Sequence, residues 1–182
     1  MNLIEHRGYQ IQLIDARASD KAVFRSLMQM YLYDTSEFNG QDPDSHGQYD
    51  YPDLDHYWTE RGRSEEGRIP ILIRINDRLA GFMLINRFSL LYPHGSTTRN
   101  LADFFIMRKW RGKRIGRIIV KEIFDMFPGH WEIRQQQENE KSQRFWRNAI
   151  GEYTNDSFKE TILNDERWQG PVQQFTNLTR IT

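Results

Sequence analysis

The sequence predicts an α/β or α+β fold in which helices flank one mixed, mostly antiparallel, twisted sheet. Two observations carry this prediction. Residues 70–86, PILIRINDRLAGFMLI within that stretch, read as a hairpin: a strand at Pro70–Ile75, a turn at Asn76-Asp77 and a returning strand at Leu79–Asn86. Further along, a strand at 100–107, a helix at 114–127 and a strand at 131–136 have the order of a right-handed parallel crossover.

The elements before the hairpin follow from local patterns. Tyr9–Ile14 alternates and predicts the first strand. A helix is expected to begin at Ser19 or Asp20, whose oxygen can cap it, and to end near Phe38. Residues 39–55 are polar and contain glycine and proline, which predicts a loop, and a short helix is expected over 55–61.

The elements after the hairpin are predicted in the same way. The helix at 114–127 has Ile115, Ile119, Ile123 and Met126 on one face and stops before Pro128-Gly129. We expect a further helix over 141–150, closed by Gly151. The last strands are expected at 152–157 and 172–177.

Bulk properties limit the function. A chain of 182 residues suits one domain, 1–182. Zero net charge argues against bulk attraction to nucleic acid, and the lack of cysteine removes thiolate chemistry and fits a reducing compartment. The histidines have no metal-ligand spacing, and no run is apolar enough for a signal core or a membrane span. We therefore expect a cytoplasmic protein with no metal, no membrane partner and no nucleic acid.

Charge is unevenly distributed along the chain. Residues 31–60 hold eight acids and no Lys or Arg, and residues 108–121 hold seven Lys or Arg and no acid. The second stretch follows a strand and contains Gly112 and Gly116 where a helix starts. Unpaired N–H groups at a helix start, with the helix dipole, favour an anion, so we expect a phosphate to bind here. The alternative is that the glycines serve an ordinary turn and the charges solvate the surface.

These residues resemble the GNAT family of N-acetyltransferases, from about residue 8 to 157. The family's cofactor signature is Arg or Gln, two residues, Gly, one residue, and Gly or Ala. The hexapeptide 111–116 supplies Arg111 and Gly116, with Arg114 in place of the middle Gly. We expect the Cβ of Arg114 to be tolerated through a negative φ, with its guanidinium on phosphate; alternatively it weakens cofactor binding. Downstream, Asn139, Ser142, Phe145 and Trp146 match a second family pattern, in which Trp146 stands where Tyr is frequent.

The resemblance implies acetyl-CoA as cofactor and transfer of its acetyl group to an amine. It implies splayed central parallel strands, acceptor-side helices and loop at about 19–62, an acetyl-CoA-binding core at about 70–150 and C-terminal strands at about 152–178. Asn139 has the alternative of a plain helix cap. The cofactor-binding residues it implies are Phe105, Ile106, Met107, Arg111, Gly112, Lys113, Arg114, Ile115, Gly116, Arg117, Asn139, Ser142, Phe145 and Trp146.

For catalysis, the resemblance requires a base for the amine and an acid for the thiolate. Asp103 is the candidate base or water relay, with a plain strand-end role as the alternative. Trp146 is not a usable acid, which leaves Tyr153 or departure of coenzyme A as the thiolate.

Acceptor specificity in the family comes from the first helices and their loop. Tyr31, Tyr33, Asp34 and Glu37 are the predicted acceptor-binding residues. With Tyr49, Asp50, Tyr51 and Tyr57 they would form an acidic, aromatic mouth that attracts a cation. We expect a small-molecule or peptide amine, such as a polyamine, an aminoglycoside-like amine, a lysine or an N-terminal amine. The resemblance leaves a homodimer open.

Two other functions compete with this reading. The fold could bind acyl-CoA without catalysis, with Arg114 and Trp146 as marks of lost activity. The basic stretch, with Trp110 beside it, could bind nucleic acid, although the zero net charge argues against it.

Overall fold

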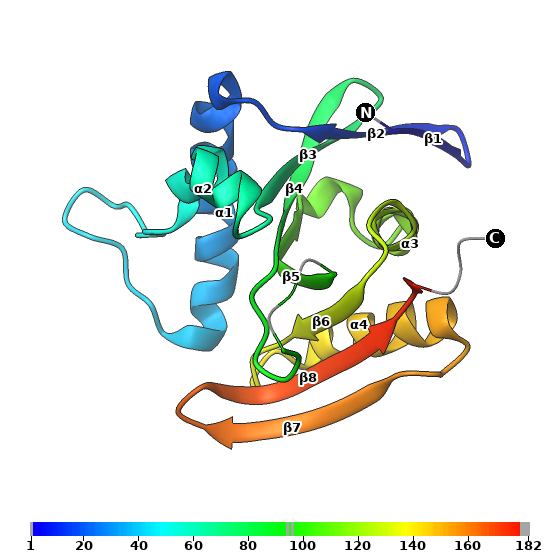
Figure 1. The fold of residues 1–182 in the computed structure, drawn as a ribbon. Helices are drawn as coiled ribbons and strands as arrows, with labels where there is room; N and C mark the ends of the chain where they lie inside the picture. Colours follow the sequence, from blue (N-terminus) through cyan, green and yellow to red (C-terminus); the bar gives the residue numbers. More distant parts are fainter. Residues whose placement is uncertain (1, 94, 96, 179–182) are drawn as a thin grey trace. The chain divides into compact units, whose positions relative to one another are not determined.

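The computed structural model describes residues 2–93, 95 and 97–178 (Figure 1). Its residues cluster into two compact units. The first unit comprises Met1–Ile85 and Asp103–Trp110, and the second comprises Asn86–Ala102 and Arg111–Thr182. Strand β5 contributes its last residues to the first unit and its first residues to the second. Each unit is described below by itself.

The first unit contains a run of antiparallel strands with a helix packed on it (Figure 1). In chain order its elements are β1 (Asn2–His6), β2 (Tyr9–Asp15), α1 (Lys21–Asn39), the short helices at Leu54–Trp58 and Glu60–Ser64 (α2), β3 (Ile69–Ile75), β4 (Arg78–Asn86) and the end of β5 (Thr98–Ile106). The hairpin is confirmed: Asn76 and Asp77 both have positive φ, 50° and 59°, as a tight primed turn requires. Strand β1 is an addition to the predicted elements.

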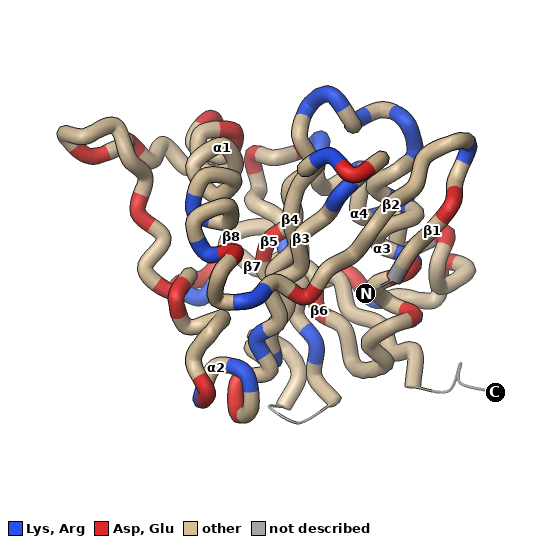
Figure 2. Tube along the Cα trace, turned by 90° about the horizontal axis from the view of Figure 1, so that it is seen from above, with Lys and Arg blue, Asp and Glu red and all other residues tan. Residues whose placement is uncertain are grey.

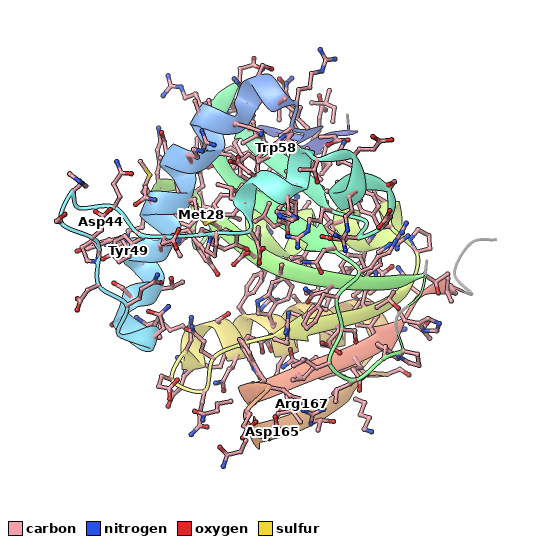
Figure 3. The ribbon with its side chains drawn as sticks, turned by 60° about the vertical axis from the view of Figure 1, so that its left-hand side comes forward. Met28, Asp44, Tyr49, Trp58, Asp165 and Arg167 are labelled. Carbon is pink, nitrogen blue, oxygen red and sulfur yellow. The ribbon has the colours of Figure 1, made fainter. Side chains whose placement is uncertain are left out.

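The core of the first unit lies between α1 and the strands. Phe24 and Leu27 of α1 are fully buried, and the ring of Phe24 lies 5.1 Å from that of Phe82 in β4. The ring of Trp58 lies 5.4 Å from that of Phe24, and its indole N–H donates to the Ala16 carbonyl at 3.0 Å (Figure 3). Tyr57 belongs to this core with no exposed surface, so the expectation that it lines an acceptor mouth is wrong.

The second unit contains the crossover and the C-terminal hairpin (Figure 1). Its elements are the start of β5, α3 (Ile115–Met126), β6 (His130–Arg134), α4 (Glu140–Thr154), β7 (Lys159–Asp165) and β8 (Trp168–Thr176). Strands β5 and β6 are parallel, as predicted, whereas β8 is antiparallel to both β6 and β7. The parallel pairing stops at Leu101, opposite Ile133, although β5 runs on to Ile106.

The core of the second unit is aromatic. Phe124 of α3 lies 4.8 Å from both Trp131 of β6 and Phe175 of β8, measured between ring centroids. The predicted apolar face of α3 is confirmed, since Ile119 and Ile123 are fully buried. Through β5, the strand order is β1-β2-β3-β4-β5-β6-β8-β7, an open mixed sheet of the predicted class.

Two predictions at the end of the chain are wrong. Helix α4 does not close at Gly151 but continues to Thr154, so residues 152–157 are not a strand. Gly151 is needed for a different reason: a Cβ there would lie 2.6 Å from the Asp156 carboxylate, because the chain folds back on the helix after Asn155. The strand that the sequence did not predict is β7. Its last residue, Asp165, forms an ion pair of 2.6 Å with Arg167 in the turn to β8 (Figure 3).

Candidate active site

The glycine-bearing turn of the second unit has the features of a phosphate cradle. Helix α3 begins at Ile115, and no side chain caps its start. The first N–H groups of a helix have no partner within the helix, and the dipole adds positive potential there. A Cβ at Gly112, where φ is +75°, would meet no atom within 4 Å, so the turn is open at this point. These features fit a bound pyrophosphate.

Arg114 adopts a backbone conformation that differs from the expected one. Its φ is +61°, in the left-handed region, so the expectation of a negative φ is wrong. The cause is its position, because Arg114 is the residue from which α3 starts and the turn reverses there. A residue with a Cβ is strained in this conformation, which explains why glycine suits the same place.

Two of the seven Lys and Arg residues in the basic stretch 108–121 are paired with acids of the second unit. Arg117, a predicted cofactor ligand, contacts Glu152 at 3.2 Å, and Lys121 contacts Asp125 at 2.6 Å. Both pairs lie within the second unit. The sequence could not reveal the first of these pairs, because its partners lie 35 residues apart.

The downstream pattern forms the start of α4. Asn139 is its N-cap and accepts a hydrogen bond of 2.9 Å from the Ser142 N–H, as the capping interpretation predicts. Trp146 is buried, and the ring of the half-buried Phe145 lies 5.1 Å from it.

Tyr153 lies in the packed interior of the second unit. Its hydroxyl donates to Asp125 at 2.9 Å and accepts from the Asn177 amide at 3.1 Å, and only 8% of the residue is exposed. Phe124 and Phe175 flank its ring. These contacts favour a packing role for Tyr153 over a role as the proton donor to the thiolate.

In the first unit, β5 ends against β4 at an unusually close approach. A Cβ at Gly81 would lie 2.0 Å from the Phe105 carbonyl oxygen, so only glycine fits there. Just beyond, the Met107 N–H donates to the Ala80 carbonyl at 2.8 Å. Phe105 and Ile106, two predicted cofactor contacts, are 5% and 8% exposed. The Met107 N–H is therefore already bonded to the neighbouring strand.

Two phenols converge on Asp103, the candidate base. The Tyr51 hydroxyl donates to the Asp103 carboxylate at 2.5 Å. Burial raises the pKa of Tyr51 far above its usual value, and the Asp103 charge adds to the shift. The pKa of Tyr31 is also raised well above 10.0. Burial is the largest cause, and the charge of Asp103 and a hydrogen bond to Asp103 raise the pKa further. Both phenols therefore stay protonated and donate to the carboxylate.

Beside this cluster the first unit has an open cavity of about 490 Å³. Helix α1, the loop at 40–53 and the end of β5 form its walls, and its lining is mostly apolar. The residues that line it are Gln29, Met30, Tyr33, Asp34, Gly47, Tyr49, Phe105, Met107 and Arg108. Tyr31, predicted at the mouth, lies deeper: its ring is 6.2 Å from that of Phe105.

Asp34 is the acid that lines this cavity. Its carboxylate accepts a hydrogen bond of 2.8 Å from Arg108, which the sequence placed with the phosphate-binding cations. Glu37 is exposed and raises the pKa of Arg108, after the larger effect of Asp34. The acids of the loop are spread along its outer course (Figure 2), and Asp42, Asp44 and Asp50 are exposed. Of the acids predicted to form the acceptor mouth, Asp34 lines this cavity, whereas Glu37 and Asp50 do not.

Residues that the predicted site omits hold it together. Gln29 forms two bonds with the backbone of Tyr49, donating to its carbonyl at 2.9 Å and accepting from its N–H at 2.7 Å, which ties the loop to α1 (Figure 3). The sequence placed Tyr51 at the mouth without linking it to Asp103. An isolated glycine in a strand indicates close backbone approach, so Gly81 was recognisable; the long-range partners of Gln29 were not.

Among the described residues, no three His, Cys, Asp or Glu side chains gather closely enough to hold a metal ion. Within the same part of the chain, no helix is long and apolar enough to cross a membrane.

Comparison with known families decides the identity of the fold. Residues 27–151 match the model of the acetyltransferase (GNAT) family. The chain belongs to the GNAT family. GNAT acetyltransferases are acyltransferases, and the matched range contains both Asp103 and the 111–116 turn. No curated protein matches the sequence.

Solved structures agree with this GNAT fold. The aminoglycoside acetyltransferase AAC(6')-Ib in complex with coenzyme A has a TM-score of 0.60 at 14% identity, covering 91% of this chain and 94% of that one. An acetyltransferase from Thermus thermophilus gives 0.63 at 12%, covering 92% and 97%. A GNAT-family acetyltransferase from Listeria monocytogenes gives 0.62 at 15%, covering 97% and 100%.

Proposed function

We propose that this acetyltransferase moves an acetyl group from acetyl-CoA directly to the primary amine of a cationic acceptor, either a small molecule or a lysine or N-terminal amine. The observation that carries the proposal is the Asp103–Tyr51 hydrogen bond beside an open cavity whose lining includes Phe105 and Met107. The family resemblance assigns these two lining residues to the cofactor's pantetheine arm.

The residues present fit the cofactor. The uncapped start of α3, the open turn at Gly112 and the cations Arg111, Lys113 and Arg114 suit a pyrophosphate. Structures with this fold have been solved with coenzyme A, among them AAC(6')-Ib and a paia N-acetyltransferase from Thermoplasma acidophilum. Bound acetyl-CoA would supply an activated thioester, so that the nitrogen–carbon bond forms as the carbon–sulfur bond breaks.

The protein's own part in the reaction is proton removal. An amine is nucleophilic only when it is neutral, so a base must accept its proton. As the amine proton passes to the Tyr51 oxygen, the phenol proton passes to the Asp103 carboxylate. The raised pKa of Tyr51 suits this relay, because the phenol never remains ionised. With the hydroxyl of Tyr153 bonded to Asp125, we propose that coenzyme A leaves as the thiolate.

The test is chemical. The protein is incubated with acetyl-CoA and a panel of cationic, neutral and anionic primary amines, and products are identified by mass spectrometry together with thiol release. We expect N-acetylated product, formed fastest from cationic amines. A thermal shift with acetyl-CoA but no product from any amine would contradict catalysis and support a module that only binds acyl-CoA.

A further inference from the structure

The phenol of the proposed relay, Tyr51, lies in a long irregular segment of the first unit. Residues 40–53 connect α1 to the short helix at Leu54–Trp58, and the structure describes all of them without a helix or strand. Their least exposed side chains, Gln41, Tyr49 and Tyr51, are only half-buried. A segment of this length with no secondary structure and no buried apolar side chain is held only weakly by its own residues. The position of the Tyr51 hydroxyl therefore depends on specific contacts with the rest of the unit.

One such contact holds the backbone two residues before Tyr51. The side-chain amide of Gln29 donates to the Tyr49 carbonyl at 2.9 Å and accepts from the Tyr49 N–H at 2.7 Å (Figure 3). Two hydrogen bonds to one residue fix both the position and the orientation of its backbone, as they do between neighbouring antiparallel strands. Gln29 belongs to α1, and its neighbours Leu27 and Met28 are buried. The backbone of Tyr49 is therefore attached to a well-packed helix.

The other contacts of the segment attach it less firmly to α1. Gln41 donates to the Asp50 carbonyl at 3.4 Å. The Tyr49 hydroxyl donates to that of Ser36 at 3.5 Å. Both distances are longer than the usual range for a hydrogen bond. Asp44 accepts from two N–H groups of the same segment, so it shapes the turn without attaching it to the helix.

The link between Gln29 and Tyr49 lies between two cavities of the first unit. Both residues line the mostly apolar cavity described above, and both also line a second, more polar cavity of about 380 Å³. Tyr51 lines the second cavity, so its side chain can be reached from there. Loss of the link would open the wall between the cavities and release the segment that carries the phenol.

The relay depends on the exact place of this phenol. The Tyr51 hydroxyl donates to the Asp103 carboxylate at 2.5 Å, and proton transfer requires such a short hydrogen bond. At roughly 3.3 Å per residue, Tyr49 and Tyr51 are at most about 7 Å apart along the chain, so a backbone shift at Tyr49 is passed on to Tyr51. A misplacement of about 1 Å can lower the rate of an enzyme by about 10².

We propose that Gln29 is a positioning residue, which holds the Tyr51 hydroxyl on Asp103 by fixing the backbone of Tyr49. Gln29 transfers no proton itself, and its amide affects the rate through the phenol. This inference rests on the proposed acetyl transfer and names the residue that assembles the proton relay of that reaction.

The test is a double-mutant cycle of the wild type, Q29A, Y51F and the double variant. We would measure kcat and KM with acetyl-CoA and the amine that the wild type acetylates fastest, together with the Kd for acetyl-CoA and Tm. The matched control is Q41A, which removes a glutamine of the same segment whose hydrogen bond is long, 3.4 Å. Q29E is the conservative variant, because it keeps the acceptor for the Tyr49 N–H and loses the donor.

Q29A should lower kcat by roughly 10–10²-fold, with KM and the Kd for acetyl-CoA within about threefold of the wild type. In the Y51F background, which has no phenol to misplace, the same substitution should change kcat by less than about twofold. The kcat of Q29E should lie between those of the wild type and Q29A, and Q41A should match the wild type. Because Q29E keeps one of the two bonds, it tests the inference even if Q29A folds poorly.

Two results would overturn this inference alone. A wild-type kcat in Q29A with a lower Tm would give Gln29 a purely structural role. Equal losses of kcat from Q29A in the wild-type and Y51F backgrounds would show that Gln29 acts independently of Tyr51. An unchanged kcat in Y51F would instead overturn the proposed relay, and acetylation of no amine would overturn the proposed function, and this inference would fall with either.

Discussion

Replacing Arg114 with glycine should make the protein more stable and lower its affinity for coenzyme A. The gain comes from the backbone, because Arg114 has a φ of +61° and the left-handed region costs an L-residue roughly 1–2 kcal/mol. Glycine offsets part of this gain, because its unfolded chain has more conformational freedom to lose on folding, which costs about 0.5–1 kcal/mol. The net gain is about 1 kcal/mol, which for a chain of this length raises Tm by about 2–4 °C.

The matched variant is R114A, which removes the same guanidinium but keeps a Cβ in the strained conformation. Tm is measured by calorimetry without ligand, and the Kd for coenzyme A is measured by titration calorimetry. R114G should gain stability and R114A should not. Both should bind coenzyme A about tenfold more weakly if the guanidinium contacts a phosphate. An R114G protein no more stable than R114A would refute the strain argument, and unchanged affinity in both would remove Arg114 from the cofactor site.

Two further predictions follow from buried phenols. Y153F should lower stability by about 1 kcal/mol through the lost bonds to Asp125 and Asn177 while kcat stays the same; a large loss of kcat at intact stability would restore Tyr153 as the acid. Because the pKa of Tyr51 is raised in the folded state, its contribution to the free energy of unfolding is complete below pH 10 and falls by about 1.4 kcal/mol per pH unit above it. The free energy of unfolding, measured with urea, should therefore decrease less steeply above pH 10 in Y51F than in the wild type. Equal slopes in the two proteins would contradict this.

The parts of the fold that the sequence predicts are those written in local patterns. The hairpin turn at Asn76-Asp77 and the buried face of α3 depend on neighbours in the chain, and both are confirmed. Strand β7 has no clear alternation because most of it is exposed, so its sequence gives no periodic signal. Gly151 was misread because a glycine near a helix end usually closes it; here it makes room for Asp156.

The candidate site divides in the same way. The turn at 111–116 is contiguous, and its family pattern was visible in the sequence. The partnership of Arg108 with Asp34 joins residues 74 positions apart, and that of Tyr51 with Asp103 joins residues 52 apart. No local rule selects these partners among the many acids and tyrosines available. The backbone conformation of Arg114 was also hidden, since arginine rarely adopts a positive φ.

The most direct test of the account is the effect of D103N on turnover. The substitution keeps the shape of the side chain and an oxygen that can accept from Tyr51, but removes the base. With acetyl-CoA and the best amine of the panel, kcat should fall by roughly 10²–10⁴, as is typical for the loss of general base catalysis, while the Kd for acetyl-CoA and Tm stay close to those of the wild type. A D103N enzyme that turns over within about threefold of the wild type would show that Asp103 is not the proton acceptor and would contradict the proposed mechanism.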